Sequence, residues 1–132
     1  MRNKIEILDE IYANAMPQIK LYLESARKLI GDESRWLQGS GATDGYGKPC
    51  DPLLSTAVCW CSIGAVRAVM GRSFNTESGM DLFAAMVCFL NRNTPGKSIL
   101  EYNDRADVKH SNIMAVFDTT IENLKLDGET EQ

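Results

Sequence analysis

The sequence of 132 residues contains no long hydrophobic run and only one histidine. No apolar segment approaches the roughly 18–20 residues that a helix needs to cross a bilayer, so we expect no membrane insertion. The N-terminal segment M-R-N-K-I-E-I-L-D-E lacks the apolar stretch and the small-residue cleavage site of a secretory signal. Both absences predict a cytoplasmic protein.

Cysteine is also scarce, and its four positions follow no recognisable disulfide framework. Without an export signal, Cys50, Cys59, Cys61 and Cys88 are expected to be reduced thiols. Clustered positive charge is missing as well, since the net charge is −4 and the basic residues are scattered singly. Proteins that bind along nucleic acid need many Lys and Arg residues to displace counterions from phosphates. The charge distribution therefore argues against DNA or RNA as the main ligand.

The remaining composition is that of an ordinary soluble globular protein, with 44% hydrophobic and 24% charged residues. A chain of this length is most simply one domain, and no internal repeat or linker divides it. We therefore predict a single globular domain over residues 1–132, with a polar, frayed tail at about 128–132.

Apolar residues recur at helical spacing in four parts of the chain. Residues 4–30 predict either two helices or one helix kinked at Pro17, because proline lacks the N–H donor and clashes with the preceding turn. Gly31 is a suitable C-terminal stop for this segment. The predicted fold is mainly α, a compact single domain of four or five helices. The other helices are expected at about 51–70, 78–90 and 107–126, with a short extended piece at 99–102.

The segment from Trp36 to Pro52 is rich in glycine and proline and carries no helical pattern. Its D-G-Y-G step is suited to a small β-hairpin, since glycine reaches positive φ at little cost. The segment is neither a Walker A sequence nor a dinucleotide fingerprint, but long irregular loops in small domains are often functional. At its end, Asp51-Pro52 combines an N-cap with proline at the first helical position, which predicts that the next helix starts there.

The stretch V-C-W-C-S-I-G-A, residues 58–65, falls within that predicted helix. Helical residues two apart point about 200° away from each other, so Cys59 and Cys61 would neither share a metal ion nor form a disulfide. We predict no metal site. Cys61 lies on an apolar stripe and is expected to be a core residue. Gly64 costs a helix about 1 kcal/mol against alanine, which the close approach of another backbone or a bulky ring usually offsets.

A nucleophilic Cys61 is the alternative to core packing. It would need a thiol pKa lowered by a helix N-terminus or by a nearby histidine. The predicted helix places Cys61 about two and a half turns from its start, which leaves His110, the only histidine, as the base. Asp104 or Asn103 would then orient His110, so the candidate catalytic residues are Cys61, His110 and Asp104.

Four short motifs follow one another along the chain: R-W-L-Q-G at 35–39, W-C-S-I-G-A at 60–65, Y-N-D at 102–104 and H-S-N-I-M-A-V-F-D-T-T-I at 110–121. The series resembles an uncharacterised family of small bacterial and phage proteins, with W-x-x-G, C-x-x-G-A and N-D motifs and a final helix that opens near a histidine. The resemblance implies no activity, and Tyr102 departs from it, because the family often has tryptophan there. The matching positions are Trp36, Gly39, Cys61, Gly64, Ala65, Asn103, Asp104 and His110.

Asn103 and Asp104 precede the last predicted helix and allow two interpretations. Locally, such side chains accept hydrogen bonds from nearby N–H groups and fix a turn or a cap. Functionally, they would place an amide and a carboxylate at the mouth of a pocket with apolar walls. The candidate ligand-binding residues are Trp36, Gly39, Tyr102, Asn103 and Asp104.

These observations favour a small, cytoplasmic, non-enzymatic binding or accessory protein, and the resemblance adds a phage-encoded, host-modulating role as an expectation. The protein would hold a small ligand or a protein partner near Trp36, the Gly-rich loop and Asn103-Asp104. The alternative is a cysteine-dependent hydrolase or transferase that uses Cys61 and His110. We expect no cofactor, and the sequence leaves the ligand, the partner and the oligomeric state open.

Overall fold

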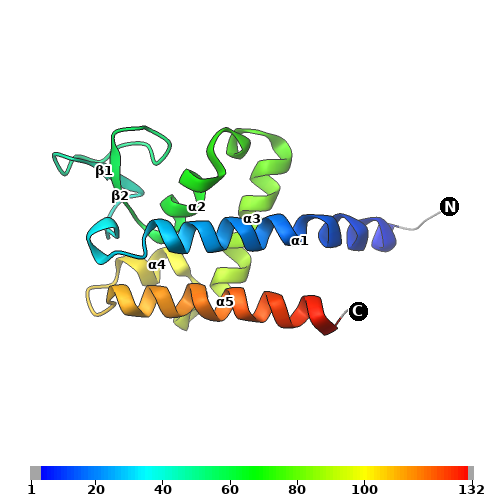
Figure 1. Cartoon of the computed structure of the whole chain (residues 1–132). Coiled ribbons are helices and arrows are strands. Elements are labelled where there is room, and N and C mark those ends of the chain that lie inside the picture. Colours follow the sequence, from blue (N-terminus) through cyan, green and yellow to red (C-terminus); the bar gives the residue numbers. More distant parts are fainter. Residues whose placement is uncertain (1–3, 131–132) are drawn as a thin grey trace.

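Helix α1 (Lys4–Leu29) and helix α5 (His110–Thr130) lie side by side and antiparallel along the molecule (Figure 1). The computed structural model describes the backbone of residues 4–130 and the side chains of residues 15–125. Within this range the chain forms five α-helices and one two-stranded antiparallel sheet. The prediction of a compact, mainly α single domain with a small β element is therefore confirmed. No helix in the described range is long and apolar enough to cross a membrane.

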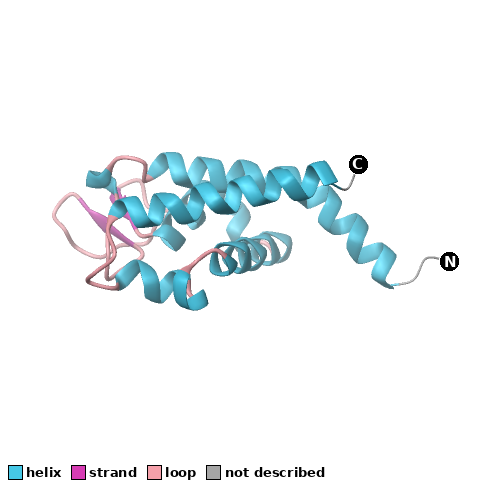
Figure 2. Ribbon diagram, turned by 90° about the horizontal axis from the view of Figure 1, so that it is seen from below, coloured by secondary structure: helices cyan, strands magenta, loops and turns pink. Residues whose placement is uncertain are grey.

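Pro17 lies inside α1 and does not end it. Of the two predicted alternatives, one kinked helix is correct, and Figure 2 shows the N-terminal part of α1 turned away from the direction of α5. Proline removes one main-chain donor and crowds the preceding turn, which is the usual cause of such a bend. The helix ends at Leu29, and the N–H of Gly31 then donates to the carbonyl of Lys28 at 3.2 Å.

The sheet pairs β1 (Ala42–Asp44) with β2 (Ala57–Trp60), and helix α2 (Ser62–Met70) follows almost directly. The prediction of a helix from Asp51-Pro52 was therefore wrong for residues 51–61. Asp51 caps a turn, because its carboxylate accepts from the N–H of Leu53 at 2.8 Å. An aspartate can cap a turn as well as a helix, so Asp51 alone does not predict a helix. The residues of β2 are extended because they pair with β1.

The D-G-Y-G step forms a tight turn beyond β1. One carboxylate oxygen of Asp44 accepts from the N–H groups of Tyr46 and Lys48, at 2.9 and 3.0 Å. Thr43 forms an antiparallel bridge with Pro49 across this turn. The expected hairpin is present in this short form, but the longer partner strand β2 lies outside the Gly-rich segment.

Helix α3 (Glu77–Arg92) occupies its predicted position, whereas α4 (Ile99–Asp104) replaces the predicted extended piece. The start of α4 is fixed by the Ser98 hydroxyl, which accepts from the N–H of Glu101 at 3.3 Å. It is also fixed by a tertiary bond from the Ile99 N–H to the Asn91 side chain, at 2.8 Å. Helix α5 continues past the predicted end at Leu126 to Thr130, and residues 131–132 of the predicted tail lie outside the described residues.

The hydrophobic core lies between the helices, and each large apolar side chain that it buries contributes about 1.5–3 kcal/mol. The sheet and the Gly-rich loop lie outside this core, at one end of the molecule, beside α2 and α4 (Figure 1). The largest fully buried apolar side chains are Phe117, Ile19, Leu23, Ile30, Met86, Leu90, Ile99, Ile113 and Leu124.

Candidate functional site

The Gly-rich loop, which is the segment of residues 36–52, contacts the first turn of α2 directly. A Cβ atom on Gly64 would lie 1.9 Å from the carbonyl oxygen of Gly41, and the same oxygen accepts from the N–H of Cys61 at 3.1 Å. The expectation that Gly64 admits a close neighbour is confirmed. Of the two expected kinds of neighbour, it is a backbone, that of Gly41 in the loop, and not a bulky ring.

Cys61 is the N-cap of α2, and its sulfur accepts from the N–H of Gly64 at 3.2 Å. The prediction that it lies well inside a helix was wrong, because the helix begins one residue later. The expected burial is confirmed, with 6% of the residue exposed. Burial raises the pKa of the Cys61 thiol, the N–H groups of Gly64 and Ile63 oppose the rise, and the negative charge of Asp104 adds to it. The protonated thiol is therefore the favoured form.

The helical argument about the C-x-C pair also fails, because Cys59 belongs to β2 and Cys61 caps α2. The two sulfurs nevertheless have separate environments. The Cys59 thiol is partly exposed and donates to the carbonyl of Ser34 at 3.2 Å. The Cys61 sulfur instead accepts a hydrogen bond from the N–H of Gly64 in α2.

Asn103 is a buried junction between segments that lie far apart in the sequence. Its side-chain oxygen accepts from the indole N–H of Trp36 at 2.9 Å and from the N–H of Ser62 at 3.0 Å. Its amide nitrogen donates to the carbonyl of Leu37 and to the Asp104 carboxylate, both at 3.0 Å. Both acceptor sites and both donors of the amide are thus used inside the protein, so its role extends well beyond a local turn.

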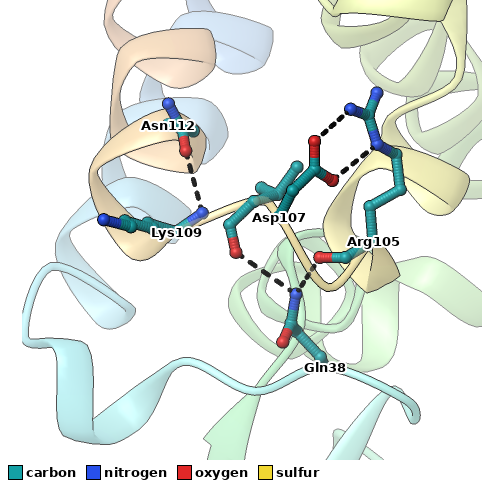
Figure 3. A network of polar contacts seen from close by, with 6 residues as sticks. Gln38, Arg105, Asp107, Lys109 and Asn112 are labelled. Atoms are coloured by element: carbon teal, nitrogen blue, oxygen red, sulfur yellow. Dashed lines mark hydrogen bonds and ion pairs between the residues drawn. The ribbon is translucent and has the colours of Figure 1, made fainter.

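Asp104 and Gln38 extend this junction to the loop and to the α4–α5 connection. The Asp104 carboxylate accepts from the N–H of Gly39 at 3.0 Å. The Gln38 amide donates to the carbonyls of Asn103 and Arg105, at 2.9 and 2.7 Å. Figure 3 shows Gln38 pointing into the connection, beside the Arg105–Asp107 ion pair with its 2.6 Å contact. Asp104 is therefore hydrogen-bonded to the backbone of Gly39, and Gln38, next to Gly39, is hydrogen-bonded to the backbone of the α4–α5 connection.

His110 lies on the α1 side of Trp36. Its Nε2 atom is 2.7 Å from the carbonyl oxygen of Ile30, and its ring centre is 6.0 Å from that of Trp36. Within the described side chains, no hydrogen bond joins His110 to Cys61 or to Asp104. The structure therefore does not assemble the candidate catalytic set around one point.

A pocket of about 230 Å³ opens between the Gly-rich loop, the first two turns of α2 and α4. It brings together four residues singled out by the sequence, namely Gly39, Cys61, Gly64 and Asp104. Trp36 and Asn103 support the loop from behind, and Tyr102 is buried, with the Arg105 guanidinium 5.5 Å above its ring. The pocket is lined by Gly39, Ser40, Gly41, Pro52, Cys61, Ile63, Gly64, Arg67, Leu100 and Asp104.

Residues 15–123 match a family of unknown function, DUF6197. The chain belongs to this family. The expected membership of an uncharacterised family is thereby confirmed. Neither the curated proteins nor the solved structures gave a significant match to the chain.

The motifs of this DUF6197 member converge on one place, although they are remote in the sequence. Trp36 and Asn103, whose side chains are bonded to each other, are 67 residues apart. The C-x-x-G-A motif supplies the cap of α2 and the glycine that admits the loop. The motif residues thus build the wall behind the pocket and one side of the pocket itself.

Sequence reasoning missed several residues that line the pocket in this DUF6197 protein. Arg67 and Leu100 carried no signal, because a single arginine in a helix and a single exposed leucine are common on protein surfaces. Gly41 had an indirect signal, since Gly64 predicts a close neighbour and the Gly-rich loop offers glycines that allow one. Arg67 stacks on Phe74 at 4.5 Å, and its Nε atom is buried without a hydrogen-bond partner among the described residues.

Proposed function

We propose that the chain is a small, non-enzymatic binding protein that holds a small molecule in the pocket between the Gly-rich loop and α2. The observation that carries the proposal is that two neighbouring polar residues at the end of α4, the buried Asn103 and the exposed Asp104, brace the loop beside this pocket. Asn103 and Asp104 hold Leu37 and Gly39 by hydrogen bonds of 3.0 Å. A loop fixed in this way loses little freedom when a ligand binds, which favours affinity.

The size and lining of the pocket support a small metabolite as the ligand. A volume of about 230 Å³ lies below the roughly 300–1,000 Å³ of sites for drug-sized molecules. Apolar surface comes from Pro52, Ile63 and Leu100, and charge comes from Arg67 and Asp104. Apolar walls with a few convergent polar groups are typical of small-molecule sites. A concave site of this size favours a small ligand over a protein partner.

The proposed setting is the cytoplasm, and a phage-encoded, host-modulating role belongs to the same proposal. The four free cysteines support a reducing compartment such as the cytoplasm. The resemblance to small bacterial and phage proteins supports the role. Sequestering a small metabolite is a function that a protein of this size performs without catalytic groups.

A cysteine-dependent hydrolase or transferase is the second candidate, because Cys61 lines the same pocket and sits at a helix N-terminus. Its thiol pKa is nevertheless raised by burial, whereas a nucleophile needs a lowered one. The proposed base, His110, is within hydrogen-bond distance of the carbonyl oxygen of Ile30, on the α1 side of Trp36. These two features place the binding function first.

The test is to identify what the purified protein carries. The protein is denatured, and the released small molecules are identified by mass spectrometry and then returned to the refolded protein in a calorimeter. We expect one compound that binds at a ratio of one to one. Leu100→Glu should abolish its binding, because Leu100 is 57% exposed and lines the pocket. Leu21→Glu is the matched control, since Leu21 is 61% exposed on α1.

Loss of binding in both leucine variants, or retention in both, would place the ligand elsewhere and defeat the proposal. So would a protein that releases no compound and binds none of the probes described below. Release of a chemically altered product from an added ester or amide would favour the enzyme instead.

A further inference from the structure

We infer that the ligand is a zwitterion whose cationic group contacts Asp104 and whose anionic group contacts Arg67, with an apolar chain between the two. This inference rests on the proposed function and assigns the ligand class of the same pocket.

Asp104 presents an uncompensated negative charge at one end of the pocket. One of its carboxylate oxygens is held by the N–H of Gly39 and by the amide of Asn103, each at 3.0 Å. These neutral donors orient the carboxylate and leave its net charge in place. Among the described side chains, Asp104 takes part in no ion pair, whereas Asp107 and Asp118 each bind an arginine at 2.6 Å.

Arg67 presents a positive charge that is only weakly compensated. Its nearest carboxylate is that of Asp51, at 3.9 Å, which is beyond hydrogen-bond distance. Its guanidinium lies over the ring of Phe74 at 4.5 Å, and its side chain is 30% exposed. The Nε atom itself is buried without a partner among the described residues, so contact with a ligand falls to the rest of the guanidinium.

Asp104 and Arg67 line one pocket but do not pair with each other. Their separation follows from the geometry of α2. Asp104 lines the pocket together with Cys61, the cap of α2, and the backbone of Arg67 is six residues further along, which corresponds to about 9 Å along the helix axis from Cys61. The surface between them includes Ile63 and Leu100. A ligand that satisfies both charges must therefore separate its own charges by an apolar chain, which an α-amino acid does not do.

Four probes test this arrangement by calorimetry with the full chain. They are 6-aminohexanoate, its isomer 2-aminohexanoate, hexylamine and hexanoate. The two isomers have the same atoms and charges and differ only in the charge separation. We expect 6-aminohexanoate to bind at least ten-fold more tightly than each of the other three, because only it reaches both ends of the pocket.

Two charge-removing variants test the assignments of the ends. Asp104→Asn keeps an oxygen for the N–H of Gly39 and removes the charge, so the preference for 6-aminohexanoate over hexanoate should vanish. Arg67→Met keeps packing on Phe74, so the preference over hexylamine should vanish. Asp81→Asn and Arg72→Met, at exposed positions, should change neither preference. Thermal unfolding of all four variants shows that each is folded.

Several results would overturn the inference. Equal affinity for the two isomers would show that charge separation is not recognised. Tighter binding of hexylamine or hexanoate would show that one charge is sufficient. If the compound released on denaturation is neutral or carries one sign of charge, the inference fails while the proposed binding function stands. A released zwitterion with separated charges supports the inference even if the probes bind weakly.

Discussion

At the scale of single residues, Asn103 shows how one buried amide organises a site. Its four hydrogen bonds join Trp36, Leu37, Ser62 and Asp104, which lie on three separate stretches of chain. The residue is 1% exposed, and its partner Ser62 is fully buried, so removal of the amide would leave the N–H of Ser62 without an acceptor. The sequence identified Asn103 through its motif, but two-residue motifs do not reveal partners that are more than 60 residues away.

We expect Asn103→Ala to lower the free energy of unfolding by about 2–5 kcal/mol. The substitution leaves the indole N–H of Trp36 and the N–H of Ser62 without their acceptor, and each unpaired buried donor costs about 1–3 kcal/mol. Urea unfolding followed by circular dichroism measures the change. Asn123→Ala is the control, because the Asn123 side chain is exposed and, among the described residues, is hydrogen-bonded only to Asn93, so the variant should stay within about 0.5 kcal/mol. Equal effects of both substitutions would contradict the role given to Asn103.

The environment of Cys61 predicts slow alkylation. At about pH 7.5, iodoacetamide should modify the exposed Cys88 well before Cys61, because Cys61 is buried and its thiol pKa is raised. Peptide mapping at successive times gives the two rates. Modification of Cys61 as fast as that of Cys88 would instead support the nucleophile hypothesis.

The same pKa shift predicts the sign of a stability change with pH. The thiol of Cys61 has a higher pKa in the folded chain than in the unfolded chain, so the unfolded chain loses this proton first as the pH rises. The free energy of unfolding should therefore fall above about pH 8.5, the ordinary pKa of a thiol. Comparison of the slope with that of Cys61→Ala isolates this contribution, and identical slopes would show that Cys61 does not cause it.

At the scale of elements, the contact between the Gly-rich loop and α2 leaves no room for a side chain at Gly64. Gly64→Ala would bring a Cβ atom to 1.9 Å from the Gly41 carbonyl oxygen, which only a backbone shift can relieve. We expect a loss of about 1–3 kcal/mol or more, together with loss of ligand binding, since Gly41 and Gly64 both line the pocket. Thermal unfolding and calorimetry measure the two effects. Gly45→Ala is the matched control, because a Cβ there meets nothing within 4 Å, and an equal loss in both variants would contradict the close contact.

The elements also show where sequence patterns are sufficient. Helices α1, α3 and α5 were predicted because long amphipathic stripes with glycine or polar residues at their ends have few alternatives. The failures were α4 and the residues before α2. Ile99–Asp104 is too short for periodicity to decide, and its helical start depends on the tertiary bond from Ile99 to Asn91. Residues 57–60 are extended because β1 pairs with them, which no local signal records.

At the scale of the whole molecule, the pocket is a product of convergence. The loop, α2 and α4 come from three parts of the chain, and each contributes a few of the lining residues. The sequence predicted the mainly α class, the family and two of the pocket residues among its five candidate ligand-binding positions, Gly39 and Asp104. It did not predict Arg67 or Leu100, because their importance depends only on what the fold places opposite them.

The hydrogen bond from Trp60 links the fluorescence of this residue to the pocket. The Trp60 indole N–H donates to the carbonyl of Pro52 at 3.2 Å, and Pro52 lines the pocket. The emission of an indole depends on the polarity and hydrogen bonding around its ring, so a ligand that displaces Pro52 should shift the fluorescence without any added label. Trp60→Phe should remove this shift and Trp36→Phe should retain it, and the opposite pattern would contradict the assignment. The emission of Trp60 would then report how much of the protein has ligand in its pocket, so unmodified compounds could be screened in solution.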